Sequence, residues 1–200
     1  MQINARVADR LEQLIAVIFY GFLTWRLIAS GLPNLQVWAV LVSDGTILAF
    51  LLIRRATEGI SMRVDDWLVA VVGTSAALLI EPAHPAIDAT IGLTLMFIGM
   101  GVSIAAKLVL RRSFGLVAAN RGVKKGGLYG LVRHPMYIGY MITHVGTLLV
   151  LPSLWNLAVY AVAWTGLVLR IRAEERVLMQ DADYAAYAKR VPYRLVPGVY

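Results

Sequence analysis

Long apolar runs alternate with short polar segments along most of the chain. Six runs are long enough to form helices that cross or nearly cross a bilayer, and they cover residues 11–30, 36–53, 66–82, 88–110, 136–151 and 155–171. A helix rises about 1.5 Å per residue, and a hydrocarbon core is about 30 Å thick. The run 136–151 therefore reaches only about 24 Å. The pattern predicts an all-α, polytopic transmembrane helical bundle with about five to six spans.

Positive charge is confined to alternate connections between these runs. All of the 19 Lys and Arg residues except Arg26 and Lys107 fall in residues 1–10, 54–65, 111–135 and 170–200. The three short turns, marked by Pro33 with Asn34, by Pro82 to Pro85 and by Pro152 with Ser153, carry none. Six spans would put the four basic segments on one side, which the positive-inside rule identifies as cytoplasmic. Both termini are then expected in the cytoplasm.

The composition agrees with a membrane protein. Hydrophobic residues make up 59% of the chain and charged residues only 16%, where a soluble domain has about a quarter charged. The net charge of +7 lies beside the apolar runs, so we expect it to face anionic membrane lipids and not nucleic acid. The chain has no cysteine, which excludes disulfides, thiolate metal sites and cysteine nucleophiles. Three histidines without ligand spacing predict no metal site.

The first apolar run follows Arg6 and Arg10, as in a signal peptide. It continues from Leu11 to about Ser30, which is long enough to span a bilayer, and further runs follow. We therefore expect an uncleaved first helix in an integral membrane protein of the bacterial cytoplasmic membrane, or of the endoplasmic reticulum if the source is eukaryotic.

Candidate chemistry is concentrated in the last 80 residues. Residues 121–135 form a basic, glycine-rich loop that ends at Pro135, a residue suited to the first position of a helix. The helix start beside His134 offers free backbone N–H groups, which favour an anion. Arg170 and Glu174 are four residues apart and share a helix face. A helical hairpin over 136–171 would bring Arg170 and Glu174 back to the membrane level of His134 and the helix start.

This hairpin is predicted to gather seven polar side chains at one cytoplasmic level: Arg133, His134, Tyr137, Arg170, Arg172, Glu174 and Glu175. Such an interfacial site suits a charged soluble cofactor together with a lipidic substrate. Arg172 and Arg176 are interpreted as topology determinants.

Three blocks carry a family resemblance, namely GLYGLVRHPMYIG from Gly127, RIRAEERVL from Arg170 and YAAYAKRVP from Tyr184. In order and spacing they resemble the isoprenylcysteine carboxyl methyltransferase family and its bacterial relatives. The resemblance covers about the last 80 residues, whereas residues 1–110 match only as generic spans.

The resemblance implies S-adenosylmethionine as the cofactor, held by the C-terminal hairpin and tail at the cytoplasmic face. By motif position, its contacts would fall within Arg121 to Lys124 and on the start of the hairpin, and Arg170 would face the substrate as the catalytic residue. The implied cofactor-binding residues are Val123, Lys124, Tyr129, His134, Pro135, Met136, Tyr137 and Glu174. The chain is then a single methyltransferase domain, in which residues 1–110 shape the acceptor pocket and residues 111–200 hold the cofactor.

The acceptor implied by the resemblance is a lipidic or prenylated small molecule, most simply one with a carboxylate. A carboxylate with a pKa of about 3.5 is already ionised and needs no general base, whereas an amine acceptor would need one. Three alternatives remain open: a phospholipid N-methyltransferase, an NADPH-dependent sterol-type reductase on a related helical core, and a non-catalytic protein on this scaffold. The identity of the acceptor and the oligomeric state stay open.

Some polar and small residues within the runs have competing interpretations. Asp44 inside an apolar run indicates either a functional or broken-helix site or an ion pair with Arg26. His144 is expected to be a hydrogen-bonded interior residue. Gly99 and Gly101 are expected to form a close helix-packing surface.

Tyr184 and Tyr187 are expected to belong to an interfacial amphipathic segment and not to contact the substrate.

Overall fold

The computed structural model describes residues 4–29, 35–81, 83 and 86–200, and this part of the chain is helical. Its seven α-helices are α1 (Ala5–Ala29), α2 (Leu35–Ile53), α3 (Val64–Ser75), α4 (Ala89–Leu110), α5 (Pro135–Val150), α6 (Leu154–Leu178) and α7 (Ala182–Arg190). Three short 3₁₀ turns, at Ala76–Leu79, Arg111–Ser113 and Gly127–Gly130, lie between them. The prediction of an all-α fold is confirmed.

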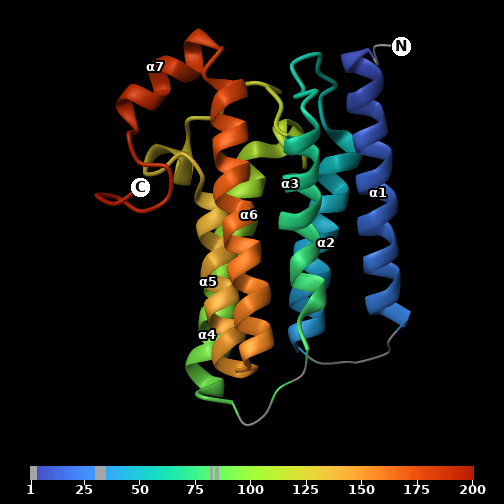
Figure 1. Cartoon of the computed structure of the whole chain (residues 1–200), viewed down its shortest axis with the longest axis vertical. Coiled ribbons are helices and arrows are strands. Elements are labelled where there is room, and N and C mark those ends of the chain that lie inside the picture. The colour runs from blue at the N-terminus through green and yellow to red at the C-terminus, as the bar shows by residue number, and fades with distance from the viewer. Residues whose placement is uncertain (1–3, 30–34, 82, 84–85) are drawn as a thin grey trace.

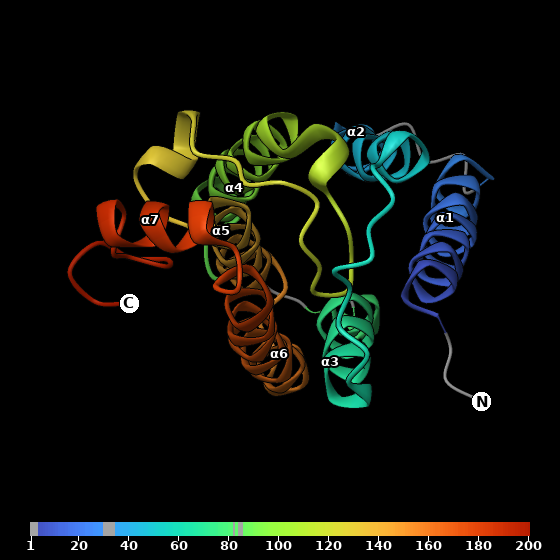
Figure 2. The same cartoon turned by 90° about the horizontal axis from the view of Figure 1, so that it is seen from above.

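The six long helices lie side by side and alternate in direction, while the short α7 lies across one end (Figure 1). Three neighbouring pairs carry the packing, α1 with α2, α3 with α6, and α4 with α5. Seen from above, α1 and α2 form one group and α4, α5 and α6 another, and two connecting segments cross between the groups (Figure 2).

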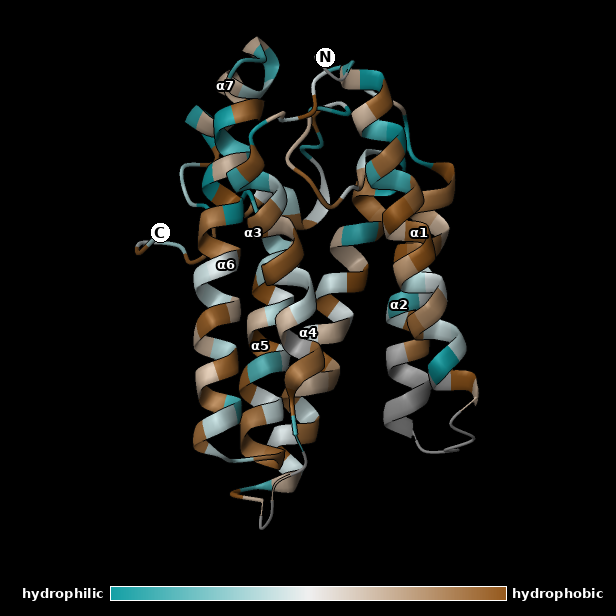
Figure 3. Cartoon of the chain, turned by 45° about the vertical axis from the view of Figure 1, so that its right-hand side comes forward, coloured by the Kyte–Doolittle hydropathy of each residue, from teal (hydrophilic) through white to brown (hydrophobic). Residues whose placement is uncertain are grey.

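The four basic segments meet at one end of the bundle. Arg55 N donates to Arg112 O at 2.8 Å, and Ser61 N donates to Ala118 O at 2.8 Å. Arg54 forms an ion pair with Asp9 of α1 at 3.0 Å. Hydrophilic residues are concentrated at this same end, where α7 and the N-terminus lie (Figure 3).

Two helices are long and apolar enough to cross a bilayer by length and composition, Ala89–Ser113 and Leu154–Leu178. Two further apolar segments, Leu41–Ile53 and Pro135–Val150, are shorter. The number of spans therefore stays a prediction.

The predicted runs correspond to the six long helices, with three corrections at their ends. The first helix begins at Ala5 and not near residue 11. The third ends as an α-helix at Ser75 and continues as a 3₁₀ turn over Ala76–Leu79. The sixth continues from residue 171 to Leu178, because the charged side chains of its last turns find partners inside the protein. The turns predicted at Pro33 with Asn34 and within Pro82 to Pro85 lie outside the described residues, apart from Ala83.

Glycines allow α4 and α5 to touch along their backbones. A Cβ atom on Gly99 would lie 2.5 Å from Gly139 O, and one on Gly92 would lie 2.8 Å from Gly146 O. The close packing predicted at Gly99 is confirmed. The same prediction is wrong for Gly101, which is exposed and has nothing within 4 Å of its Cβ position.

His144 is a hydrogen-bonded interior residue, as predicted. Trp164 Nε1 donates to His144 Nδ1 at 3.2 Å, and the His144 ring stacks on Tyr160 with centroids 4.3 Å apart.

Asp44 is part of an unbroken helix, so the broken-helix interpretation is wrong. Among the described residues, Arg26 forms no ion pair with Asp44. The buried Lys107 of α4 donates to Ser43 Oγ, beside Asp44, at 3.2 Å.

The glycine contact gives a matched pair of variants. Gly99→Ala should lower the free energy of unfolding by about 1–3 kcal/mol, because the new methyl group has no room against α5. Gly101→Ala on the same helix should be neutral or stabilise by about 0.4–1 kcal/mol, since it only restricts the unfolded chain. Unfolding in detergent micelles measures both. Equal effects of the two variants would contradict the packing described here.

Candidate functional site

A buried carboxylate joins the start of α5 to α6 and α7. Glu175 of α6 accepts from Arg133 Nε at 2.8 Å and from Tyr184 OH at 2.7 Å. His134 Nε2 is hydrogen-bonded to the same Oε1 atom at 2.8 Å. Arg133 also donates to Val191 O at 2.8 Å, which ties the end of α7 to this group. Glu175 is therefore fully committed to protein partners.

The neighbouring carboxylate, Glu174, faces a different direction and stays partly exposed. It accepts from Tyr137 OH, and Arg170 Nε lies 3.3 Å from its Oε1 atom. His134 Nδ1 lies 3.6 Å from its Oε2 atom. The Glu174 side chain keeps 20% exposure, against 8% for Glu175, so it can receive further donors from a ligand.

Glu174 lines a cavity at the polar end of the bundle, with about 730 Å³ of empty space that includes the solvent at its open mouth. The walls come from the end of α4, the 113–124 segment, the start of α5, the end of α6 and the inner face of α7. The polar and aromatic residues of the wall are Ser113, Phe114, Arg121, Lys124, Tyr129, Arg133, His134, Tyr137, Glu174, Tyr184 and Tyr187. A molecule with cationic or hydroxyl groups, an anionic group and a flat ring finds partners here.

Arg170 lies behind this cavity, at its inner wall. Its Nη2 atom donates to Gly115 O at 3.0 Å, and its Nη1 atom is 3.5 Å from Thr74 Oγ1. The guanidinium also lies 5.5 Å from the ring centroid of Tyr137. Gly115 belongs to the cavity wall, whereas Thr74 belongs to a second hollow.

The second hollow is an apolar groove between α1 and α3, with about 620 Å³ of empty space. Its lining residues are Glu12, Ile15, Ala16, Phe19, Trp67, Ala70, Val71, Thr74, Ser75, Leu116 and Val117. Val117 lines the groove and also the cavity. The two hollows therefore meet at the wall formed by residues 115–117, where Arg170 is held.

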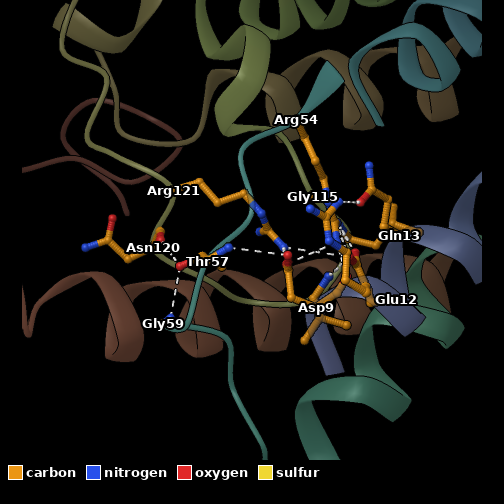
Figure 4. A network of polar contacts seen from close by, with 12 residues as sticks. Asp9, Glu12, Gln13, Arg54, Thr57, Gly59, Gly115, Asn120 and Arg121 are labelled. Atoms are coloured by element: carbon orange, nitrogen blue, oxygen red, sulfur yellow. Dashed lines mark hydrogen bonds and ion pairs between the residues drawn. The ribbon is translucent and has the colours of Figure 1, made fainter. Parts of the chain in front are cut away.

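A buried ionic network supports this wall from the side of α1 (Figure 4). Arg121 Nη2 lies 2.6 Å from Asp9 Oδ1 and 3.6 Å from Glu12 Oε2. Arg54 forms ion pairs with both carboxylates. Burial and the neighbouring Arg54 lower the pKa of Arg121, while Glu12 and Asp9 oppose this effect. Arg121, a contact implied by motif position, is thus engaged within the protein.

The structure brings most of the predicted cofactor-binding residues to one cavity. Seven of them line it: Val123, Lys124, Tyr129, His134, Met136, Tyr137 and Glu174. Pro135 is fully buried at the first position of α5 and lies outside the lining. Arg170 is one helix turn from Glu174, as its spacing predicts, and contacts the cavity wall through Gly115. Their functional roles stay predictions.

Arg172 was one of the seven polar residues predicted to gather at this level, but it is exposed and does not line the cavity. Arg176 instead pairs with Asp66 of α3 at 2.6 Å.

The interpretation of α7 as an interfacial segment is wrong for its tyrosines. Tyr184 and Tyr187 are buried, line the cavity and donate inward, Tyr187 OH to Tyr129 O at 2.6 Å. Burial raises the pKa of Tyr187 to about 12, and burial with Glu175 raises that of Tyr184. Both therefore stay neutral donors. Their spacing of three residues indicates that both tyrosines lie on one face of a short helix. It does not indicate whether that face contacts protein or lipid.

Comparison with known proteins finds similarity to methyltransferases. Residues 87–185 match the family described as phospholipid methyltransferase. Protein-S-isoprenylcysteine O-methyltransferases B and A of Arabidopsis thaliana are each 34% identical to this chain, over 109 and 108 residues, which is 50% of this chain and 55% of each relative. The Schizosaccharomyces pombe protein-S-isoprenylcysteine O-methyltransferase is 29% identical over 111 residues, which is 52% of this chain and 47% of the relative.

The chain thus spans about half the length of the curated relatives that it matches. The family match begins just before α4 and ends within α7, so it includes the hairpin, Glu174, Arg170 and most of the cavity wall. Over these residues the chain is similar to the phospholipid methyltransferase family and to the protein-S-isoprenylcysteine O-methyltransferases.

Proposed function

We propose that this protein is an integral membrane methyltransferase that transfers a methyl group from S-adenosylmethionine to the carboxylate of a prenylated cysteine, on a protein, a peptide or a small molecule. The observation that carries the proposal is the junction at Arg170. A polar cavity that contains Glu174 and an apolar groove share one wall there. The names of the relatives support the acceptor.

The residues of the cavity fit the methyl donor. Glu174 has free acceptor capacity for ribose hydroxyls or for the ammonium group. The positive end of the α5 dipole, which begins at Pro135, suits a carboxylate. Tyr129 and Tyr137 supply aromatic surface. The bound donor would supply an electrophilic sulfonium methyl group, and the protein would contribute mainly the alignment of the two reactants.

The groove fits the apolar part of the acceptor. Its lining is almost entirely apolar, and it runs from the outer faces of α1 and α3 to Thr74, beside Arg170. A prenyl chain in the groove would bring the attached carboxylate to the Arg170 guanidinium. The acceptor carboxylate is ionised at neutral pH and would take the methyl group through one oxygen as the methyl–sulfur bond breaks and S-adenosylhomocysteine leaves, so no general base would be needed. We assign residues 1–110 to the acceptor side and residues 111–200 to the donor side of a single domain.

The bilayer would surround the bundle with its polar end in the cytoplasm and both termini inside. The α1 helix supports this placement, because large apolar side chains are exposed along its length: Val7, Leu11, Leu14, Ile15, Ile18, Phe22, Trp25 and Ile28. Exposed apolar surface of this extent indicates contact with lipid or with another protein. The groove opens beside this face, so a lipidic acceptor can enter from the membrane.

Binding of S-adenosylhomocysteine tests the donor site. Glu174→Gln should weaken its binding about ten- to a hundredfold, since a charge-assisted hydrogen bond is worth about 1.5–3 kcal/mol. Calorimetric titration of the detergent-purified protein measures this, with NADPH as the competing ligand. Glu81→Gln, an exposed carboxylate outside the cavity lining, should bind as the wild type does. Tight NADPH binding without S-adenosylhomocysteine binding would favour the reductase, and binding of neither would favour a non-catalytic protein.

The acceptor route is tested at two adjacent valines of α3. Val71 lines the groove beside α1, whereas Val72 lines a shallow apolar surface hollow against α6. Val71→Trp should raise the KM for N-acetyl-S-farnesylcysteine about tenfold by filling the groove, the equivalent of about 1.4 kcal/mol of acceptor binding. Val72→Trp should leave this KM unchanged. The reverse result would place the acceptor between α3 and α6. Methylation of a phospholipid amine, and not of the carboxylate, would show that the acceptor is a phospholipid.

A further inference from the structure

We propose that Glu12 of α1 is a positioning residue for the acceptor in this methyl transfer, acting through the wall of residues 115–117. The inference rests on the proposed function. Glu12 lies outside the residues that match the family, and it touches the donor cavity only through other groups.

Glu12 holds the backbone of the wall directly. Its Oε1 atom accepts from Leu116 N at 2.7 Å and from Val117 N at 3.2 Å. This segment is irregular, with no helix or ladder to satisfy its N–H groups. Buried backbone donors almost always have a partner, and here a carboxylate 104 residues away along the chain supplies it. The position of the segment therefore depends on Glu12.

The same segment sets the junction between the two hollows. Gly115, next to Leu116, accepts from Arg170 Nη2 at 3.0 Å, and Val117 lines both the cavity and the groove. A shift of this backbone would move the carbonyl that orients Arg170, and it would change the opening between the donor and the acceptor. Glu12 thus controls the alignment of the acceptor without touching the reacting atoms.

The second oxygen of Glu12 is held by charge. Oε2 is paired with Arg54, and it lies 3.6 Å from Arg121 Nη2. Asp9 is the matched neighbour, because it pairs with the same two arginines, whereas Leu116 N and Val117 N donate to Glu12. The two oxygens of Glu12 therefore have different roles. Oε1 positions the backbone of the wall, and Oε2 pairs with the buried arginines.

Two conservative variants separate these roles. Glu12→Gln keeps an oxygen of the same reach but removes the charge, so it should be less stable, while it should lose much less kcat/KM for N-acetyl-S-farnesylcysteine than Glu12→Asp does. Glu12→Asp keeps the charge but withdraws the oxygen by one methylene. It should lower kcat/KM for this acceptor about ten- to a hundredfold, as expected for a displacement of about 1 Å at the junction. The Kd for S-adenosylhomocysteine should change little in either variant.

Asp9→Asn should be less stable, as Glu12→Gln is, and it should keep a wild-type KM for the acceptor because Asp9 does not line the groove. Wild-type kinetics in Glu12→Asp would overturn the inference. So would a loss of S-adenosylhomocysteine binding in Glu12→Asp that is as large as the loss of kcat/KM in the same variant. An equal kinetic loss in Asp9→Asn would also overturn it, because the network would then act only through stability. If the wild type binds no S-adenosylhomocysteine, the proposed function fails and the inference falls with it. If the wild type is active and Glu12→Asp is unimpaired, only the inference fails.

Discussion

The arrangement of the site depends on the buried carboxylate of Glu175. A carboxylate removed from water is costly unless charged and polar partners surround it. Arg133, His134 and Tyr184 meet this requirement, and they bring the start of α5 and the whole of α7 against α6. Successive residues of a helix point about 100° apart, so Glu174 faces the cavity while Glu175 faces the protein. One carboxylate holds the site together, and its neighbour remains available to a ligand.

The parts of the site that are local in sequence could be predicted. Pro135 suits a helix start, and α5 begins there. Arg170 and Glu174 are four residues apart on a helix, and their side chains meet. The hairpin between these groups is short, so its two ends had to meet at one level. In each case the chain itself fixes the distance between the groups.

The parts that depend on distant segments could not be predicted. Nothing in the sequence near Glu12 indicates that it accepts from the backbone of Leu116 and Val117. A backbone N–H group is present whatever the side chain is, so the residue types at positions 116 and 117 carry no signal of this contact. The roles of Tyr184 and Tyr187 were misjudged for a similar reason. An amphipathic helix shows which face is apolar, but whether that face meets lipid or protein depends on where the preceding helix ends, and α6 extends seven residues beyond the predicted run.

The buried network at Asp9, Glu12, Arg54 and Arg121 joins the two halves of the chain. A buried ion pair often contributes less to stability than apolar residues of the same volume would, so its value lies in fixing one arrangement. Here it fixes α1, which lies outside the matched residues, against the 111–124 segment, which lies within them. In the proposed function the matched residues form the donor side, whereas α1 and α3 of the acceptor groove lie outside the match. Differences in acceptor among relatives of this chain should therefore follow changes in α1 and α3, and not changes in the hairpin.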